Sequence, residues 1–283
     1  MGRKTEVIKQ NVSASKKIMV AMFLMILVAL NFSCNNTTTN SEHSNLKSIK
    51  VMSYNIHYGY GMDKIYDLPR IANIILNEKA DIVGIQEISD STMANELGRL
   101  TDMHVAFGPS IDGKMNRYGD AVLSKYPFEW VGNASIPSAS SSRYQAMAVD
   151  VNLSEIYGDG SIVRFINTHF DWKETIGSEE SRLAAVSVIE KSFLDNTKHP
   201  AILTADLNAN PDSPTLIKMG EHGWVNKYLG KNLNTYIADT VSGHIDYVLF
   251  RPEKRWIVDA IKVLDEPIAS DHLPIVMELK LLK

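Results

Sequence analysis

Polar side chains recur at one kind of position in this sequence, next to a short apolar run that has the length of a buried strand. Glu87 follows the run IVGIQ, and His169 follows the run FINT. The full set is Asn55, Glu87, His169, Asp206, Asn208, Asp271 and His272. Strand ends at one edge of a sandwich converge in space, so these side chains can line a single polar cleft.

The residue types at these positions fit metal-assisted hydrolysis of a phosphate ester. Carboxylate and amide oxygens are hard donors that suit Mg²⁺, and the sequence has neither a cysteine-rich zinc pattern nor an HExxH motif. A cation offsets the charge by which a phosphate ester repels hydroxide. A histidine titrates near neutrality and can take a proton from water when a carboxylate holds its other ring nitrogen.

Each of these residues alone is more often a solvated strand end, a turn residue or a structural histidine. The adjacent pair Asp271 and His272 adds a geometric difficulty, because neighbouring side chains point apart in a regular strand. Contact between them would need a turn. Otherwise His272 needs a different partner, and Asp206, acting through water and metal, is the expected one.

The apolar periodicity predicts many strands and few helices. Helices are expected over 68–76, 93–100, 179–193 and 214–221, the last beginning at the N-cap Ser213 with Pro214 in the first turn. Strands are expected over 49–55, 81–86, 119–123, 145–151, 162–167, 202–204, 245–250, 256–263 and 275–279. Several neighbouring strands have no helix between them, which favours an α/β sandwich with mixed or antiparallel sheets over a doubly wound parallel sheet.

The N-terminus has the order of an export signal. Five basic residues precede the apolar run Ile18 to Leu30, which is too short for a comfortable membrane span. We interpret residues 1–34 as a signal peptide, 35–47 as a flexible polar tether and 48–283 as one folded domain. Cys34 lies where a bacterial lipoprotein carries its lipid, although Asn31 departs from the usual motif. The alternatives are an uncleaved anchor helix or cleavage nearby without lipid.

The charge balance argues against general attraction to nucleic acid. Without residues 1–34 the chain keeps 24 Lys and Arg against 32 Asp and Glu, a net charge of −8. Such an acidic domain lacks the electrostatic term that drives nonspecific nucleic-acid binding. Cys34 is the only cysteine, so no internal disulfide supports the fold.

Read in order, the segments SYNIH, QEI, NTHFD, ADLN, IDYVL and SDHLP resemble the motif series of the endonuclease/exonuclease/phosphatase superfamily. The resemblance extends over residues 49–280. It implies a four-layer α/β sandwich with two central mixed β-sheets flanked by helices, and a Mg²⁺ or Mn²⁺ site at the upper edge of the sheets. The expected activity is metal-dependent hydrolysis of a phosphate ester, expected to be a phosphodiester, by activated water.

The resemblance also implies a role for each matching residue. Glu87 matches the glutamate that binds the metal, with Asn55 beside it. His169 matches a histidine that contacts the phosphate, and Asp206 and Asn208 match the pair that positions water and phosphate. Asp246 matches an acidic residue often paired with that phosphate-contacting histidine. Asp271 and His272 match a closing dyad in which the aspartate, also a candidate metal ligand, orients a histidine that acts as general base.

Several alternatives stay open at this stage. The substrate could be a lipid headgroup, a phosphorylated sugar or extracellular nucleic acid, and the rivals are an endonuclease of the same fold and a surface lipoprotein that only binds. A monomer is expected, exported and held by an N-terminal lipid in the periplasm or at the outer membrane of a Gram-negative bacterium. Trp172 could stack on a substrate or pack structurally. The remaining uncertain positions are Asp120, where the family often has asparagine, and three arginines that could contact phosphate, Arg117, Arg143 and Arg182.

Overall fold

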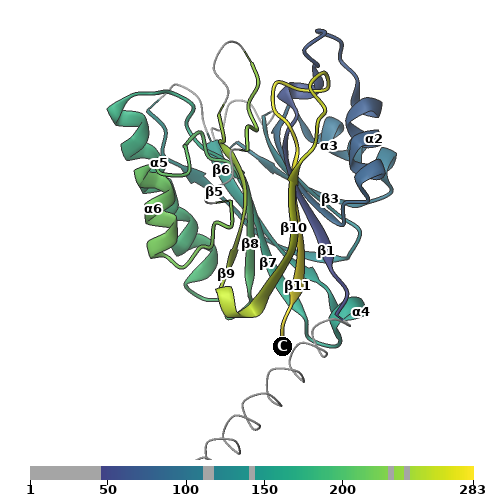
Figure 1. Cartoon of the computed structure of the whole chain (residues 1–283), viewed down its shortest axis with the longest axis vertical. Coiled ribbons are helices and arrows are strands. Elements are labelled where there is room, and N and C mark those ends of the chain that lie inside the picture. Colours follow the sequence, from purple (N-terminus) through teal and green to yellow (C-terminus); the bar gives the residue numbers. More distant parts are fainter. Residues whose placement is uncertain (1–45, 111–117, 140–143, 229–232, 239–242) are drawn as a thin grey trace, which may run out of the picture. The chain divides into compact units, whose positions relative to one another are not determined.

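Two β-sheets lie face to face in the part of the chain that begins at Lys47 (Figure 1). The computed structural model describes residues 46–110, 118–139, 144–228, 233–238 and 243–283. The first sheet has the strand order β10 (Trp256–Val263), β11 (Ile275–Leu281), β1 (Ile49–Asn55), β2 (Ile82–Ile88), β4 (Gly119–Ser124) and β3 (His104–Pro109). The second has the order β5 (Phe128–Ile136), β6 (Tyr144–Asn152), β7 (Ile162–His169), β8 (Ala201–Asp206) and β9 (Asp246–Arg251).

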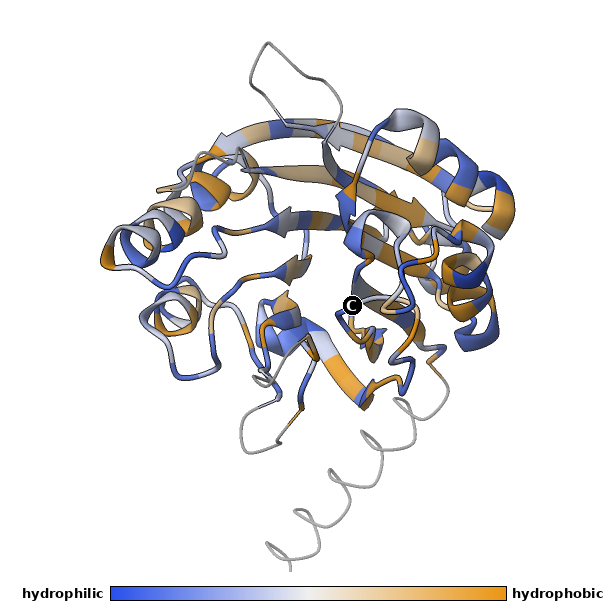
Figure 2. Ribbon diagram, turned by 90° about the horizontal axis from the view of Figure 1, so that it is seen from above, coloured by the Kyte–Doolittle hydropathy of each residue, from blue (hydrophilic) through white to orange (hydrophobic). Residues whose placement is uncertain are grey.

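Helices cover the outer face of each sheet, which gives four layers (Figure 2). The first sheet is covered by α2 (Leu68–Glu78) and α3 (Ser91–Thr101). The second is covered by α5 (Ile176–Ile189), the π-helical turn η2 (Glu190–Leu194) and α6 (Pro214–Glu221). The shorter elements are η1 (His57–Gly59), α4 (Ser154–Tyr157) and η3 (Glu253–Arg255). The predicted α/β sandwich with two mixed sheets is therefore confirmed.

Apolar side chains fill the space between the layers. Val51, Ile82 and Val122 face the second sheet, where they share one buried cluster with residues such as Phe165 and Leu203. The opposite face of the first sheet packs on α2 and α3 through a second cluster. Burial of these side chains is the main stabilising contribution, at roughly 25 cal/mol per Å² of apolar surface.

Local capping explains where the long helices begin. The side chains of Asp67, Asp90 and Ser213 accept hydrogen bonds from the third helical N–H of α2, α3 and α6, respectively. Pro214 occupies the first turn of α6, as predicted from the Ser-Pro pair.

Two strands and one short helix were missed by the periodicity, and one helix differs in extent. β3 and β5 are edge strands, and much of β5 is exposed or half-buried, so its sequence lacks the apolar run that marks a central strand. The four-residue helix α4 is too short for a periodic signal. The helix expected over 179–193 begins at Ile176 and changes to the π-helical turn at Glu190.

None of the helices in the described residues combines the length and the apolar character needed to cross a lipid bilayer. The interpretation of residues 1–34 as a signal peptide, and most of the tether, lies outside the described residues.

Candidate active site

Backbone register places three of the expected site residues side by side in the second sheet. β7 and β8 are parallel, with His169 opposite Asp206, while β8 and β9 are antiparallel, with Asp206 opposite Asp246. The first sheet contributes from its adjoining edge, because Asn55 ends β1 and Glu87 lies near the end of β2. His272 precedes β11, which pairs with β1. One polar site is thus assembled from six strands that are distant in sequence.

Asp206 lies at the centre of this site. Its Oδ1 accepts a hydrogen bond from the Asn208 backbone N–H (3.0 Å), and its Oδ2 accepts one from Asn55 Nδ2 (3.0 Å). The same Oδ2 lies 3.4 Å from His169 Nε2 and 3.7 Å from His272 Nε2. Burial raises the pKa of Asp206, and the nearby Asp246 carboxylate adds to this, while His169 opposes it. Its carboxylate therefore binds a proton more readily than an ordinary aspartate.

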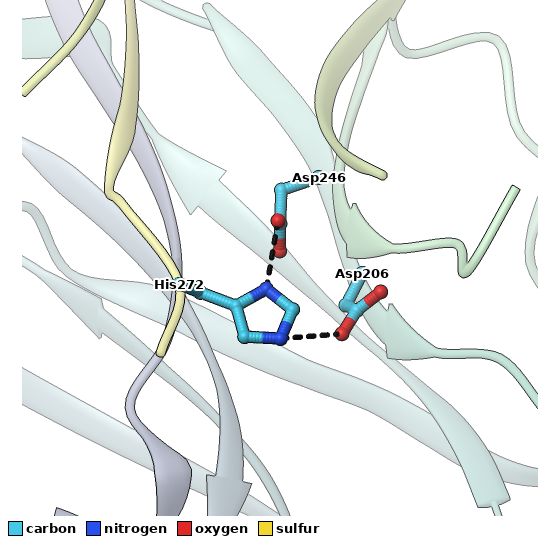
Figure 3. Close-up of side chains that lie close together, drawn as sticks. All are labelled: Asp206, Asp246 and His272. Atoms are coloured by element: carbon cyan, nitrogen blue, oxygen red, sulfur yellow. Dashed lines mark hydrogen bonds and ion pairs between the residues drawn. The ribbon is translucent and has the colours of Figure 1, made fainter. Parts of the chain in front are cut away.

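His272 lies between two carboxylates (Figure 3). Its Nδ1 is 2.8 Å from Asp246 Oδ2, and its Nε2 faces Asp206. Burial lowers the pKa of the ring, but the carboxylates of Asp246 and Asp206 outweigh it and raise the pKa to about 10. With this pKa His272 is an imidazolium at neutral pH, able to donate a hydrogen bond from each nitrogen.

The partners of His272 differ from two expectations. The side chain that holds Nδ1 is Asp246 and not Asp271, so the expectation that Asp271 orients the ring is wrong in this structure. Asp246 was in turn expected beside the phosphate-contacting histidine, His169, and it pairs with His272 instead. The reason is register, because Asp246 begins β9 and points across the site, whereas Asp271 and His272 are chain neighbours that point apart.

His169 has two neutral hydrogen-bond partners besides the nearby Asp206 carboxylate. Its Nδ1 lies 3.0 Å from the Tyr118 hydroxyl, and its Nε2 lies 3.1 Å from Asn208 Nδ2. Burial lowers the pKa of His169, so the ring is neutral near pH 7. Asn208 also donates to the Phe170 carbonyl (3.1 Å) and adopts a left-handed backbone, with φ of 47°. Strain at such a residue is typical of a position fixed for function.

Glu87 and Asn55 form the other side of the site. Asn55 Nδ2 lies 3.3 Å from Glu87 Oε1, and Asn55 Oδ1 accepts the His57 backbone N–H (3.0 Å). Glu87 lies at a β-bulge with a φ of 63°, and its buried Oε2 has no hydrogen-bond partner in the described part of the chain. Burial raises the pKa of Glu87 to about 7, and Asp206 and Asp271 contribute in the same direction.

Asp271 lies apart from the His272 ring, on the side of the site that Glu87 and Asn55 form. Its Oδ1 accepts the Ser270 hydroxyl (3.3 Å) and lies 3.8 Å from His57 Nδ1. Ser270 also donates to the Asn55 carbonyl (2.8 Å), which fixes the segment before β11 against the end of β1.

Two sets of residues could hold a divalent metal. The buried groups of Asp206, Asp246 and His272 offer ligand atoms within 4.8 Å of one another. However, both ring nitrogens of His272 already face carboxylates in this set, Nδ1 toward Asp246 and Nε2 toward Asp206. The unpartnered Oε2 of Glu87, close to Asp271, offers a free hard donor instead.

Charge supports a cation at this position. Within the described residues, no lysine or arginine forms an ion pair with Glu87, Asp206, Asp246 or Asp271, and the basic side chains nearest to the three aspartates are histidines. Buried carboxylates without such pairing destabilise one another unless a cation or protons neutralise them. The donor set at Glu87 therefore fits Mg²⁺ or Mn²⁺. Asn55 presents its amide nitrogen to the carboxylates, so its contact with a metal stays a prediction.

A buried polar network beneath the site joins the two sheets, and the sequence motifs did not single it out. Gln86 Nε2 donates to Asn167 Oδ1 (2.7 Å), and the Thr204 hydroxyl donates to the same oxygen (3.0 Å). Asn167 Nδ2 returns bonds to the carbonyls of Ile85 and Ala121, both at 2.9 Å. The signal available in the sequence was the single amide side chain of Asn167 within an apolar strand, because an amide is buried only when it has hydrogen-bond partners.

The remaining uncertain positions are resolved in part. Asp120 is fully buried and accepts a hydrogen bond from Gln145 (3.0 Å), and burial raises its pKa well above the ordinary value. Trp172 is 58% exposed, which is unlike a packed structural tryptophan. Arg182 is paired with Glu179 (2.8 Å) and donates to the Asp171 carbonyl (2.9 Å), so it supports a loop. Arg117 and Arg143 lie outside the described residues.

Comparisons with known proteins agree with this geometry. The model of the Endonuclease/Exonuclease/phosphatase family matches residues 52–272. No curated protein is similar enough in sequence to be matched to this chain.

Solved structures share the fold at low sequence identity. An endonuclease/exonuclease/phosphatase from Beutenbergia cavernae is 23% identical, with a TM-score of 0.66 over 83% of this chain and 72% of that one. The mannosyl-6-phosphatase Bt3783 of Bacteroides thetaiotaomicron is 18% identical, with a TM-score of 0.64 over 82% and 99%. The human Nocturnin catalytic domain is 21% identical, with a TM-score of 0.63 over 83% and 94%.

Proposed function

Because this chain belongs to the endonuclease/exonuclease/phosphatase family, whose members are metal-dependent phosphoesterases and nucleases, we propose that it hydrolyses a phosphate ester with the help of Mg²⁺ or Mn²⁺. The observation that carries the proposal is the buried constellation in which Asp206 faces both His169 and His272 while Asp246 holds the far side of His272. Such a pairing of titratable groups with opposed pKa shifts is typical of catalytic sites.

In this proposal Glu87 and Asp271 bind the metal, and Asn55 lies beside it. Carboxylate oxygens are hard donors, and Glu87 Oε2 has no hydrogen-bond partner among the described residues. When bound, the divalent ion neutralises charge that develops on the phosphate oxygens.

The chain's own side chains carry the proton and orient the reactants. Asp206 accepts the proton of the attacking water, since its raised pKa makes it a stronger base than an ordinary aspartate. His272, charged and fixed by Asp246, donates a hydrogen bond to a phosphate oxygen. The Asn208 amide can exchange its hydrogen bond to neutral His169 for one to a second phosphate oxygen. This division replaces the expectation that His272 is the general base.

A phosphodiester fits these charges better than a phosphomonoester. A diester carries one negative charge, and the cationic side chain of the described site is the imidazolium of His272. A monoester dianion is usually bound by additional arginine or lysine. The name mannosyl-6-phosphatase of Bt3783 describes the hydrolysis of a sugar phosphate, so one protein with this fold acts on a phosphorylated sugar.

The test is an assay of the full chain with bis-p-nitrophenyl phosphate and p-nitrophenyl phosphate, with Mg²⁺, with Mn²⁺ and with EDTA. We expect metal-dependent turnover that favours the diester. Plasmid DNA is added as a third substrate, because efficient cleavage of DNA alone would instead support the alternative of an extracellular endonuclease. Absence of turnover with every ester and metal would favour a lipoprotein that only binds.

Variants of the constellation separate catalysis from folding. Asp246→Asn should lower kcat by about two orders of magnitude or more, because the ring loses the carboxylate that fixes its charge and orientation. His272→Ala should lower kcat by a few orders of magnitude. Asp195→Asn, on an exposed residue after η2, is the matched control and should leave kcat unchanged. Wild-type turnover in Asp246→Asn would remove the proposed role of this pair.

A further inference from the structure

A cavity of about 660 Å³ lies between the segment 58–69 and the beginning of α3. We propose that this cavity binds the polyhydroxyl ring of a substrate in which the phosphate esterifies an uncharged hexose. The inference rests on the proposed function and adds to it the chemical class of the esterified alcohol. The volume is within the usual range for small-molecule sites.

The cavity adjoins the catalytic residues through two short connections. Tyr58, which lines it, directly follows His57, and its ring centroid lies 5.8 Å from that of Tyr118. The Tyr118 hydroxyl in turn lies 3.0 Å from His169 Nδ1. On the other wall, Ser89 comes two residues after Glu87. A ligand with its phosphate at the catalytic residues can therefore extend into the cavity.

Aromatic rings form one wall of the cavity. Tyr58, Tyr60 and Tyr66 all line it, and each remains 40–48% exposed. The rings of Tyr60 and Tyr66 are 5.4 Å apart and tilted by 60°. A tyrosine has an apolar face and a polar tip, so such a wall can contact the C–H groups of a sugar ring while its hydroxyls form hydrogen bonds.

The segment that carries this wall is fixed by backbone contacts. Tyr58 and Gly59 have positive φ angles of 55° and 80°, and Gly59 has Tyr66 against it, with a ring carbon 2.9 Å from where a Cβ would lie. Tyr60 and Tyr66 form an isolated antiparallel bridge. The rings are thus held in place before a ligand arrives, which lowers the entropic cost of binding.

The charged groups of the opposite wall are already engaged within the protein. Asp67 and Asp90 cap α2 and α3, and Asp67 also lies 3.4 Å from Arg70 Nε. Glu96 accepts two hydrogen bonds from Arg99, at 2.6 and 2.8 Å. These carboxylates can still accept hydrogen bonds from hydroxyl groups.

This lining disfavours anionic ligands. The described residues that line the cavity include no lysine or arginine, so a nucleic-acid chain would bring further phosphates toward carboxylates without compensation. A quaternary ammonium group would find aromatic faces but carboxylates that are already paired or capping. A neutral polyhydroxyl ring matches both the tyrosines and the acceptor groups.

The experiment uses four phosphodiesters that release the same leaving group. The full chain is assayed with the p-nitrophenyl diesters of glucose 6-phosphate, thymidine 5′-phosphate, phosphocholine and methyl phosphate. We expect kcat/KM for the sugar diester to exceed that for the methyl diester by about tenfold or more. A preference for the thymidine or choline diester, or no preference over methyl, would overturn the proposal and leave the proposed function intact.

Variants assign any preference to the cavity. Tyr60→Ala should remove most of the preference for the sugar diester over the methyl diester, and Tyr60→Phe should retain that preference because the ring face remains. Thr92→Trp, which fills the cavity from the start of α3, should act like Tyr60→Ala. Trp130→Ala is the matched control, since Trp130 is 50% exposed and does not line the cavity. An undiminished sugar preference in both cavity variants would refute the site.

A binding measurement decides the question if no ester is hydrolysed. NMR titration of the protein with methyl glucoside should shift signals of Tyr60 and Tyr66 at millimolar sugar, and these shifts should vanish in Thr92→Trp. Failure of every ester with these shifts present would remove the proposed function but keep the sugar site. Absence of the shifts would remove the sugar site itself.

Discussion

At the scale of single residues, the side chain of Asp206 contacts polar groups from both sheets of this protein. Its Oδ2 lies within 3.0 Å of Asn55 from the first sheet and 3.4 Å of His169 from the second. The same atom faces His272, whose charge is set by the carboxylates around it. The protonation states of these side chains are consequently coupled, and a cation beside Glu87 would change all of them.

Metal binding should be detectable as stability, independent of turnover. We expect Mg²⁺ to raise the Tm of the wild-type chain by several degrees, because a ligand that binds only the folded state stabilises it by about 2–3 kcal/mol at a hundredfold excess over Kd. Glu87→Gln should lose this shift, since the free carboxylate oxygen is gone. The measurement is differential scanning fluorimetry with and without EDTA.

Glu129→Gln serves as the control for that experiment, because Glu129 is an exposed residue of the edge strand β5 and should keep the full shift. If Glu87→Gln also kept the full shift, the metal would have to bind elsewhere, and the cluster of Asp206, Asp246 and His272 would become the candidate.

At the scale of elements, the close approach of β2 to the second sheet supports the site from below. Gly84 faces the second sheet, and a methyl group there would overlap the Thr204 hydroxyl and lie 2.6 Å from Asn167 Oδ1. Both of these groups belong to the buried network that links the sheets. The glycine therefore sets the spacing at which the amide hydrogen bonds can form.

Gly84→Ala should reduce the free energy of unfolding by about 1–3 kcal/mol, as expected for overpacking of a tight interior. Gly220→Ala is the control in α6, where no atom lies within 4 Å of the added methyl group. It should stabilise the protein by about 0.5–1 kcal/mol through helix propensity. Urea unfolding measures both values, and equal stability of wild type and Gly84→Ala would contradict the predicted clash.

Glu179 connects α5 to the start of α6 and should make stability depend on pH. Its Oε1 accepts the Thr215 N–H (3.0 Å) and hydroxyl (2.8 Å), and its Oε2 accepts Arg182. Burial raises the pKa of Glu179, but the hydrogen bonds from Arg182 and Thr215 outweigh it and hold the pKa below its ordinary value. The contribution is therefore complete above the unfolded pKa and is lost as pH falls through the folded one.

Glu179→Gln should lower the unfolding free energy at pH 7 by about 1 kcal/mol, a modest value because solvent screens this partly exposed carboxylate. The difference from wild type should shrink as pH falls below about 4.5, the ordinary value for this carboxyl. Urea unfolding at pH 7, 5 and 4 measures it, with Glu180→Gln on the exposed side of the same helix as control. A difference that grows on acidification would reverse the assigned sign.

At the scale of the whole molecule, we propose that the catalytic domain is exported and held at a membrane by a lipid on Cys34. The support is sequence order alone, namely basic residues, an apolar run, cysteine and a polar tract. A tether over 35–47 would leave the domain free to reach substrates near that surface.

Replacement of the proposed lipid acceptor should change where the chain is found. Cys34→Ser, expressed as the full chain in a Gram-negative host, should move the protein from the membrane fraction to the soluble fraction and abolish incorporation of labelled palmitate. Ser33→Ala is a neighbouring control that should leave both unchanged. Membrane association of Cys34→Ser without label would instead indicate an uncleaved anchor helix.

The local sequence was sufficient to predict most elements and most polar positions of the site. The apolar run before Glu87, the Ser-Pro start of α6 and the adjacency of Asp271 and His272 are all local features. Hydrophobic periodicity and helix-capping residues determine such features. The sequence alone therefore predicted nine strands and four helices, and six ordered segments indicated the family. The edge strands β3 and β5 were missed because edges bury too little to produce a pattern.

Partner choice was decided only by the tertiary structure. Asp246 reaches His272 because β9 runs antiparallel to β8 in a register that aligns Asp246 with Asp206, and Tyr118 reaches His169 from the first sheet. Register, strand direction and the distance between two packed sheets depend on contacts across the whole chain. No local period encodes them, and for this reason the sequence determined which side chains meet at this edge while the fold determined which pairs they form.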